Sequence, residues 1–361
     1  MSSSRWVKLA AAGIGAVAAA ATAGVVAERR VVRTRRSGST GADRLGGLRG
    51  DEVTLRTSDG VDLHVEVDEV APYSEGSKGR PDGDPTIVFV HGYALNLECW
   101  YFQRQFFRGK HRLVFFDQRS HGRSGTSDRE HATIDQLGDD LDLLLREVVP
   151  EGDVVLVGHS MGGMGVMAFA ERHPDTFSQR VVASALISTS AGGLHPHRMI
   201  SRLIPDAVGE QIGQRLMAGL ALAPELVDRV RRRGSNLGFL MADQFAFGDE
   251  VPASYVEFVD NMLAQTSFEV LAHFFPNFDA LDKFRVLEEF GRIPTYVIGG
   301  TKDLLTSIGH SRKMASRIPG AKLVECLGAG HMVILERKDR VNGALEEMVA
   351  AATGTRAAQV S

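Results

Sequence analysis

VVLVGHSMGGMGVMAFA, residues 154–170, is the stretch that decides the fold of this chain. Four apolar residues run into the sequence GHSMG, and an apolar segment compatible with a helix follows at once. The pattern predicts a strand, a sharp turn and a helix, with Ser160 at the turn. Such a turn strains the backbone of its central residue and exposes that side chain beside the N–H groups of the new helix. A G-x-S-x-G match arises by chance roughly 0.3 times in a chain this rich in glycine, so the rest of the sequence has to support it.

Short, continuously apolar runs recur on both sides of this stretch. TIVFVHG (residues 86–92) and RLVFFD (residues 112–117) precede it, and similar runs follow at residues 181–187 and 295–298. Runs of this kind are typical of strands that are buried on both faces of a parallel sheet. Segments compatible with helices separate them, at residues 96–107, 133–148 and 160–172. The alternation predicts an α/β fold with a doubly wound, mostly parallel sheet.

The sequence also predicts the elements at the two ends of the core. Residues 52–57 and 61–67 nearly alternate apolar and polar side chains around the turn sequence SDG, which indicates a hairpin. Toward the C-terminus we expect a helix over residues 307–318, a short strand over residues 322–326 and a closing helix over residues 334–351.

Residues 191–292 interrupt this rhythm, because they show no strand pattern. An amphipathic stretch opens with Ser254 and Glu257 in the spacing of a capping box, and we expect a helical cap inserted between two strands. The cap is rich in phenylalanine and methionine: Phe239, Met241, Phe245, Phe247, Met262, Phe268, Phe274, Phe275 and Phe278. Together they predict an apolar roof over the substrate site, and therefore a hydrophobic acyl or alkyl substrate.

The predicted organisation has four parts. A hydrophobic segment and basic linker cover residues 1–50, and the first part of the α/β core covers residues 51–190. The helical cap covers residues 191–292, and the second part of the core covers residues 293–361. With 361 residues, of which 43% are hydrophobic, the chain is long enough for one large core with an insertion.

The charge distribution is asymmetric. The first 50 residues carry nine Lys and Arg against two acidic residues, a balance of +7 that leaves −11 for the rest of a chain whose net charge is −4. An acidic body argues against nucleic acid as a partner. Cys99 and Cys326 are the two cysteines, and their separation suggests neither a disulfide framework nor a zinc site. We expect no bound metal.

The N-terminal segment is a separate question. Residues 9–27 form a charge-free run rich in alanine and glycine, and five arginines follow it within residues 28–36. The length suits a membrane anchor, and the arginines favour a cytoplasmic catalytic domain. Two alternatives stay open: an export signal cleaved near residues 21–23, and a helix that is peripheral or not anchored at all.

A nucleophilic serine needs a base and an acid that orients the base. Asp303 directly follows the predicted strand at residues 295–298, and His331 follows the last strand. The order Ser160, Asp303, His331 is the one expected for a hydrolase with this kind of turn. The strand before the cap ends in Ser-Thr-Ser at residues 188–190, without a carboxylate, which favours Asp303 as the acid.

An oxyanion formed on Ser160 also needs hydrogen-bond donors. His91-Gly92-Tyr93 follows the first buried strand, and Gly92 allows the backbone to approach closely. We therefore expect the N–H groups of Tyr93 and Met161 to form the oxyanion hole. One such donor is typically worth about 3 kcal/mol of transition-state stabilisation.

With HGYALN, DQRSHGRS, GHSMGG, GGTKD and GAGH in this order, the sequence resembles the α/β-hydrolase superfamily, in its cap-bearing branch, over roughly residues 51–352. The resemblance implies Ser160 as nucleophile, His331 as general base and then acid, Asp303 as its orienting partner, and no cofactor. One departure is Ser120, where the family usually has glycine. Epoxide hydrolases and haloalkane dehalogenases of this fold have aspartate at the position of Ser160, so those activities are disfavoured.

The sequence therefore predicts a membrane-tethered serine hydrolase that cleaves a carboxylic ester, with a hydrophobic acyl or lipid-like substrate, through an acyl-enzyme. Alternatives with the same triad are a C–C bond hydrolase and a cofactor-free haloperoxidase or perhydrolase. A non-catalytic binding module on the same fold is the alternative from another class. The polar residues around the site are expected to have structural roles: His91, Asp117, Arg119, His121 and His159.

Overall fold

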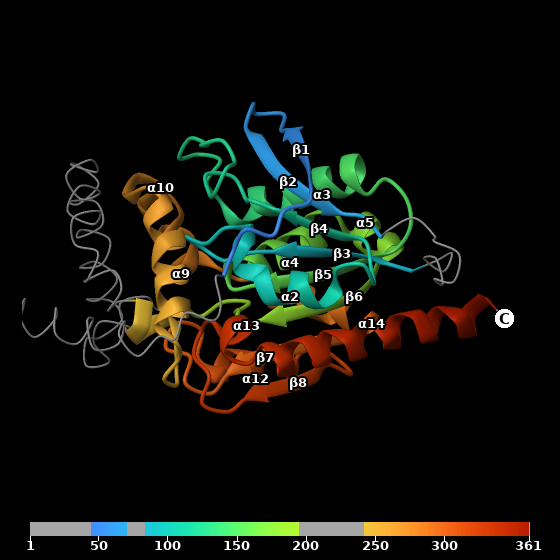
Figure 1. Ribbon diagram of the computed structural model, residues 1–361. Coiled ribbons are helices and arrows are strands. Elements are labelled where there is room, and N and C mark those ends of the chain that lie inside the picture. The colour runs from blue at the N-terminus through green and yellow to red at the C-terminus, as the bar shows by residue number, and fades with distance from the viewer. Residues whose placement is uncertain (1–44, 71–83, 195–241, 361) are drawn as a thin grey trace, which may run out of the picture.

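The computed structural model describes residues 45–70, 84–194 and 242–360. Its centre is one eight-stranded sheet with the order β1-β2-β4-β3-β5-β6-β7-β8 (Figure 1). The strands are β1 (Asp51–Arg56), β2 (Asp62–Asp68), β3 (Thr86–Val90), β4 (Leu113–Phe116), β5 (Val154–His159), β6 (Val181–Ile187), β7 (Thr295–Gly300) and β8 (Lys322–Cys326). Each was predicted from its sequence pattern, and the α/β fold is confirmed.

The pairing of the strands matches the prediction of a mostly parallel sheet. β1 and β2 form the antiparallel hairpin, and β2 also pairs antiparallel with β4. All the remaining neighbours, from β4 to β8, run parallel. Every residue of β3, β4 and β5 is buried, as expected for strands covered on both faces, whereas most of β1 at the sheet edge is exposed.

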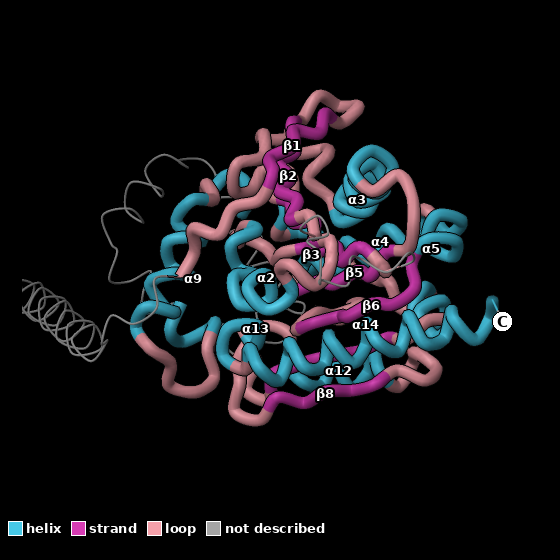
Figure 2. The backbone as a smooth tube through the Cα atoms, turned by 45° about the vertical axis from the view of Figure 1, so that its right-hand side comes forward, coloured by secondary structure: helices cyan, strands magenta, loops and turns pink. Residues whose placement is uncertain are grey.

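Helices cover both faces of the sheet (Figure 2). On β3, Ile87 and Phe89 belong to a core that includes residues of α2 (Tyr101–Phe107), α13 (Val333–Glu336) and α14 (Lys338–Val360). Val88 and Val90 point the other way, into a core formed with α3 (Ile134–Val148), α4 (Met161–Arg172) and α5 (Pro174–Arg180). α12 (Ile308–Ala315) lies between β7 and β8 in the chain. The alternation of side chains along one strand thus builds two cores, which is the doubly wound arrangement.

Two helix starts differ in how well the sequence predicted them. α3 begins as expected, because Thr133 Oγ1 accepts a hydrogen bond of 3.1 Å from the N–H of Gln136. The helix expected over residues 96–107 is divided into η1 (Leu97–Trp100) and α2, with Asn96 capping the first turn. The expected closing helix is likewise divided into α13 and α14.

The described parts of the predicted cap, residues 191–194 and 242–292, contain no strand. They hold α9 (Ala253–Gln265), α10 (Phe268–Phe274), α11 (Pro276–Ala280) and the 3₁₀ segment η3 (Val286–Arg292). Ser254 does not cap α9, because the helix begins one residue earlier, after Pro252, and has no side-chain cap. Residues 195–241, including Phe239 and Met241, lie outside the described residues, so the boundaries of the cap stay a prediction.

The N-terminal end of the fold begins earlier than expected. Residues 45–50 pack on the domain, and the N–H of Gly50 donates to Glu66 Oε2 over 3.1 Å. Leu45 packs against the core that contains Phe258 of α9. In the described part of the chain, no helix is long and apolar enough to cross a membrane. The proposed anchor at residues 9–27 lies outside that part.

Candidate active site

Ser160 stands at the predicted sharp turn between β5 and α4. Its backbone has φ 53° and ψ −121°, a left-handed conformation that costs an L-residue free energy. A Cβ atom on Gly162 would lie 2.1 Å from the carbonyl oxygen of Val90, so only glycine lets α4 pass this close to β3. Ser160 is 9% exposed. The sequence and the backbone therefore agree on a strained serine at the end of a buried strand.

The structure brings the three predicted triad residues together. Ser160 Oγ lies 2.9 Å from His331 Nε2, and His331 Nδ1 lies 3.0 Å from Asp303 Oδ2. The serine and the histidine are 171 residues apart in sequence, and the fold joins them at the carboxyl ends of β5 and β8. Both distances are those of hydrogen bonds.

Asp303 is fixed by more than its contact with His331. Its Oδ1 accepts hydrogen bonds from the N–H groups of Leu305 (2.8 Å) and Thr306 (2.9 Å), and its Oδ2 accepts one from Thr306 Oγ1 (2.9 Å). Burial alone would raise the pKa of Asp303, but His331 and the two donors of Thr306 outweigh it and lower the pKa. Asp303 is therefore an ionised, immobile partner for the imidazole.

The sequence analysis did not single out Thr306. A carboxylate that accepts from N–H groups two and three residues later forms a local turn. The sequence DLLT at Asp303 carries that signal, because threonine adds a hydroxyl donor at the end of the same turn.

The loop after β3 lies against the turn that holds Ser160. A Cβ atom on Gly92 would lie 3.0 Å from Ser160 Cβ, which places the next residue, Tyr93, beside the serine. Ala94 has φ 59°, and the N–H of Leu95 bonds to the carbonyl of Gly92, so the loop turns tightly at this point. Met161 is the first residue of α4, where backbone N–H groups have no partner within the helix. The backbone of Gly92 and Met161 thus borders Ser160, and an oxyanion hole formed by the N–H groups of Tyr93 and Met161 stays a prediction.

Two buried histidines flank the site in neutral form. His91 Nε2 accepts from the N–H of Gln118 (2.9 Å), so its Nδ1 carries the proton and donates to the carbonyl of Gly92 (2.8 Å). Burial lowers the pKa of His91 to about 3 and that of His159 also to about 3. His159 Nε2 donates to the carbonyl of His331 (3.0 Å). These contacts agree with the structural roles predicted for both side chains.

The loop after β4 is held by hydrogen bonds and ion pairs, as predicted. Asp117 accepts from the N–H groups of Leu97 and Arg123, each over 2.8 Å. Arg119 is buried and pairs with Asp140 and Asp59: Arg119 Nη2 lies 2.6 Å from Asp140 Oδ1, and Arg119 Nη1 lies 2.7 Å from Asp59 Oδ2. The arginine therefore ties the loop to α3 and to the hairpin turn.

Ser120 occupies the position where the family usually has glycine. Its φ is 66°, in the left-handed region that glycine adopts most easily. Ser120 Oγ accepts a hydrogen bond from the N–H of Ser127 over 2.9 Å. The serine thus keeps the glycine-like backbone, and its hydroxyl stabilises the loop from within.

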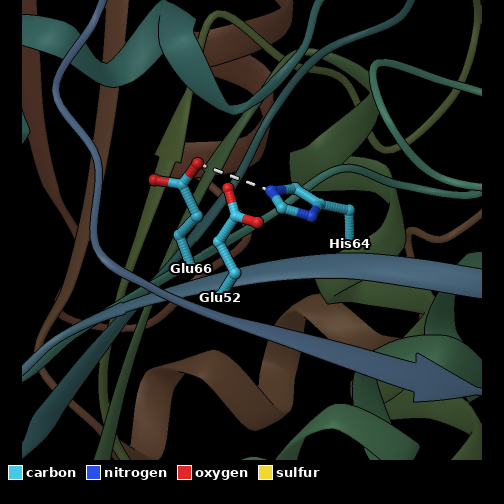
Figure 3. Close-up of side chains that lie close together, drawn as sticks. All are labelled: Glu52, His64 and Glu66. Carbon is cyan, nitrogen blue, oxygen red and sulfur yellow. Dashed lines mark hydrogen bonds and ion pairs between the residues drawn. The ribbon is translucent and has the colours of Figure 1, made fainter.

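Glu52, His64 and Glu66 form a trio of possible metal ligands within the described residues (Figure 3). Guanidinium groups already neutralise this trio. Arg123 Nη1 donates to Glu52 over 2.6 Å, and Arg104 Nη1 donates to Glu66 over 2.6 Å. Burial would raise the pKa of Glu66, but His64 and Arg104 outweigh it and lower the pKa to about 2. The donor set therefore fits an ion-pair network and not a cation site.

Known proteins resemble this chain over most of its length. A sequence model of the alpha/beta hydrolase family matches residues 87–344. The 3-oxoadipate enol-lactonase 2 of Acinetobacter baylyi is 27% identical over 268 residues, which are 73% of this chain and 88% of the relative. A non-heme chloroperoxidase of Kitasatospora aureofaciens is 28% identical over 287 residues, which are 79% of this chain and 94% of the relative.

A solved structure supports the same fold. A thermophilic esterase from Thermogutta terrifontis superposes with a TM-score of 0.63 at 22% identity, over 84% of this chain and 99% of the esterase. The family match spans more than half of the chain, including the turn at Ser160 and the loops that carry Asp303 and His331. The chain therefore belongs to the alpha/beta hydrolase family and is a hydrolytic enzyme.

Proposed function

We propose that this enzyme is a serine hydrolase that cleaves a carboxylic ester of a small hydrophobic or lipid-like substrate through an acyl-enzyme. One observation carries the proposal: His331 lies within hydrogen-bond distance of both partners, 2.9 Å from Ser160 Oγ and 3.0 Å from Asp303 Oδ2. This is the arrangement in which a serine hydroxyl can lose its proton as it attacks a carbonyl carbon.

In the proposed first half-reaction, Ser160 Oγ attacks the ester carbonyl while its proton moves to His331 Nε2. The tetrahedral oxyanion accepts hydrogen bonds from the N–H groups of Tyr93 and Met161. The imidazolium then gives its proton to the leaving alcohol oxygen as the carbon–oxygen bond breaks. In the second half, water gives a proton to His331 and attacks the acyl carbon. The imidazolium then returns that proton to Ser160 Oγ as the bond between Oγ and the acyl carbon breaks, and the acid leaves.

The electrostatics around His331 support these steps. Ionised Asp303 stabilises the imidazolium that forms in both transition states and holds the ring with Nε2 toward the serine. The ring of His159 lies close, with centroids 5.0 Å apart, and its lowered pKa keeps it uncharged. A charged ring at that distance would repel the imidazolium that forms during the proposed reaction, and the neutral His159 avoids this repulsion.

The substrate class is supported by relatives and by the cap. An enol-lactonase and an esterase are among the proteins most like this chain, and lactones and esters share the acyl–oxygen bond. Phe247, Met262, Phe268 and Phe274 are buried in the described part of the predicted cap. An apolar cap favours a hydrophobic acyl group.

The test compares wild-type protein with Ser160→Ala. We expect p-nitrophenyl ester turnover to fall on the order of 10⁵-fold or more, and labelling by a fluorophosphonate probe to disappear, with an unchanged melting curve. Ser184→Ala is the matched control, because Ser184 is also a buried serine but belongs to the adjacent strand β6. Retained turnover in folded Ser160→Ala would refute the proposal.

Other reactions of the same triad are distinguished by substrate. The chloroperoxidase relative gives a reason to include peroxide-dependent halogenation in the panel, and a vinylogous diketone tests C–C bond hydrolysis. An ester preference supports the proposal, whereas faster peroxide-dependent or C–C chemistry replaces it. The alternative of a non-catalytic binding module is set aside, because the chain belongs to a family of hydrolytic enzymes.

We also propose that residues 9–27 tether the enzyme to a membrane with the catalytic domain on the cytoplasmic side. The support is the charge-free run and the five arginines after it. Full-length protein should stay with membranes after carbonate extraction, and protein without residues 9–27 should be released. A processed N-terminus near residues 21–23 would instead identify an export signal.

A further inference from the structure

The loop after β3 is hydrogen-bonded to the described cap helices at three places. Tyr93 Oη donates to the carbonyl of Leu271 over 2.5 Å. Asn96 Nδ2 donates to Gln265 Oε1 over 3.1 Å, and Thr266 Oγ1 donates more weakly, over 3.4 Å, to the carbonyl of Ala94. The partners run from the end of α9 into α10, which lie together at one end of the sheet (Figure 1). One short loop therefore connects the cap with the turn at Ser160.

Ring packing reinforces the contact made by the tyrosine hydroxyl. The ring of Tyr93 meets Phe278 edge to face, with centroids 5.1 Å apart, and lies 6.2 Å from the ring of His121. His121 in turn packs edge-on against Phe274 of α10 at 5.5 Å. Edge-to-face contacts of this kind stabilise one relative placement of the rings. The position of Tyr93 is thus fixed against the cap by both its ring and its hydroxyl.

The other end of the same residue is its backbone, which directly follows Gly92. Gly92 leaves no free space, because an added Cβ would lie 3.0 Å from both Ser160 Cβ and His159 Nδ1. The left-handed φ of Ala94 makes the loop a tight turn with few alternative conformations. A tyrosine side chain has only two torsions and is therefore rigid. A displacement of its hydroxyl should also shift its backbone.

We propose that Tyr93 is a positioning residue that couples the placement of α10 to the oxyanion hole. The inference rests on the proposed function and deepens it: an acyl group that fits the cap leaves α10 in place, and the Tyr93 N–H then points at the oxyanion. An acyl group that displaces α10 pulls this donor out of line. Substrate selectivity therefore appears in kcat and not only in KM.

Tyr93→Phe tests the coupling, because it removes the hydroxyl and keeps the ring. We expect kcat for the best p-nitrophenyl ester to fall about three- to tenfold, with KM within about twofold. The affinity of an alkyl boronic acid, which forms a tetrahedral anion on the serine, should fall by the same factor. The variation of kcat with acyl-chain length should also become flatter than in the wild type.

Tyr101→Phe is the matched control, since Tyr101 is a half-buried tyrosine on α2 that packs on Phe102. It should leave both constants unchanged. A Tyr93→Phe variant with wild-type kcat overturns the inference, and so does a rise in KM alone, which would mean that the hydroxyl only docks the cap. Wild-type protein that neither labels with fluorophosphonate nor turns over esters overturns the proposed function itself, so the two failures are distinguishable.

Discussion

Two buried clusters contain carboxylates, one on β2 and the other beyond the ends of β5, β7 and β8, and they differ in the base that pairs with the carboxylates. In the first cluster, Arg104 bonds to both oxygens of Asp68, over 2.8 and 2.7 Å, and to Glu66 over 2.6 Å. In the second, Asp303 bonds to His331, which bonds to Ser160. A guanidinium keeps its charge at every working pH, whereas an imidazole can take a proton from one neighbour and pass it to another.

The difference indicates that the first cluster stabilises the fold and that the second carries the proposed reaction. Arg104 lies on α2 and its partners lie within β2, so the first cluster joins regular elements. Asp68 and Glu66 hold the pKa of Arg104 up against the effect of burial. Asp303 and His331 lie instead on loops that follow β7 and β8, next to a serine with a strained backbone. Substitutions in the first cluster should therefore lower stability and leave activity intact. Substitutions in the second cluster should lower activity and leave stability intact.

The largest expected effect is on catalysis. Asp303→Asn replaces the carboxylate with an amide that no longer stabilises the imidazolium or holds its tautomer, so kcat should fall on the order of 10⁴-fold. Ester kinetics measure the change, and the melting temperature should move little. A kcat within tenfold of wild type would show that the acid lies elsewhere, contrary to the position predicted from the sequence.

The next largest effect is on stability. Arg104→Met removes the buried guanidinium and leaves Asp68 and Glu66 to the partly exposed Arg108 and Arg123, so the free energy of unfolding should fall by about 3–5 kcal/mol. Urea denaturation measures this, and kcat of the folded enzyme at low temperature should stay within twofold. Arg123→Met is the control, because that side chain is 43% exposed and its loss should cost about 1 kcal/mol or less. Equal losses in the two variants would contradict the comparison.

The smallest effect concerns the strain at Ser160. Ser160→Gly and Ser160→Ala both remove the nucleophile, but glycine adopts the left-handed φ of 53° without steric cost. The glycine variant should be more stable than the alanine variant by about 1 kcal/mol. Thermal denaturation of the two inactive proteins measures the difference. If alanine proves the more stable, backbone strain is not stored at this residue.

Local patterns explain how much could be predicted from the sequence. The eight strands, the turn at Ser160 and the positions of Asp303 and His331 follow from apolar runs and from the residues at their ends, all of which are local signals. Helix boundaries were less predictable, since the start of α9 depends on Pro252 and not on Ser254. Residue propensities predict that a helix exists more reliably than they predict its first and last residues.

Contacts between residues that are far apart in the sequence could not be predicted. Arg104 is 36 residues from Asp68, and Tyr93 is 178 residues from Leu271, and nothing in either local sequence marks the partner. The glycine-like backbone of Ser120 could not be deduced either, because it depends on a hydroxyl contact with Ser127, seven residues away. Such pairs become visible only when the topology places both residues side by side.

The packing of residues 45–50 has a practical consequence for handling the protein. The carbonyl of Leu48 accepts a hydrogen bond from Arg104, and Gly46 lies beside Phe258 of α9, so the chain enters the fold next to the cap. α14 ends on the opposite side of the molecule (Figure 1). An affinity tag or surface linkage at the C-terminus therefore leaves α9 accessible, whereas one attached just before residue 45 would crowd this helix.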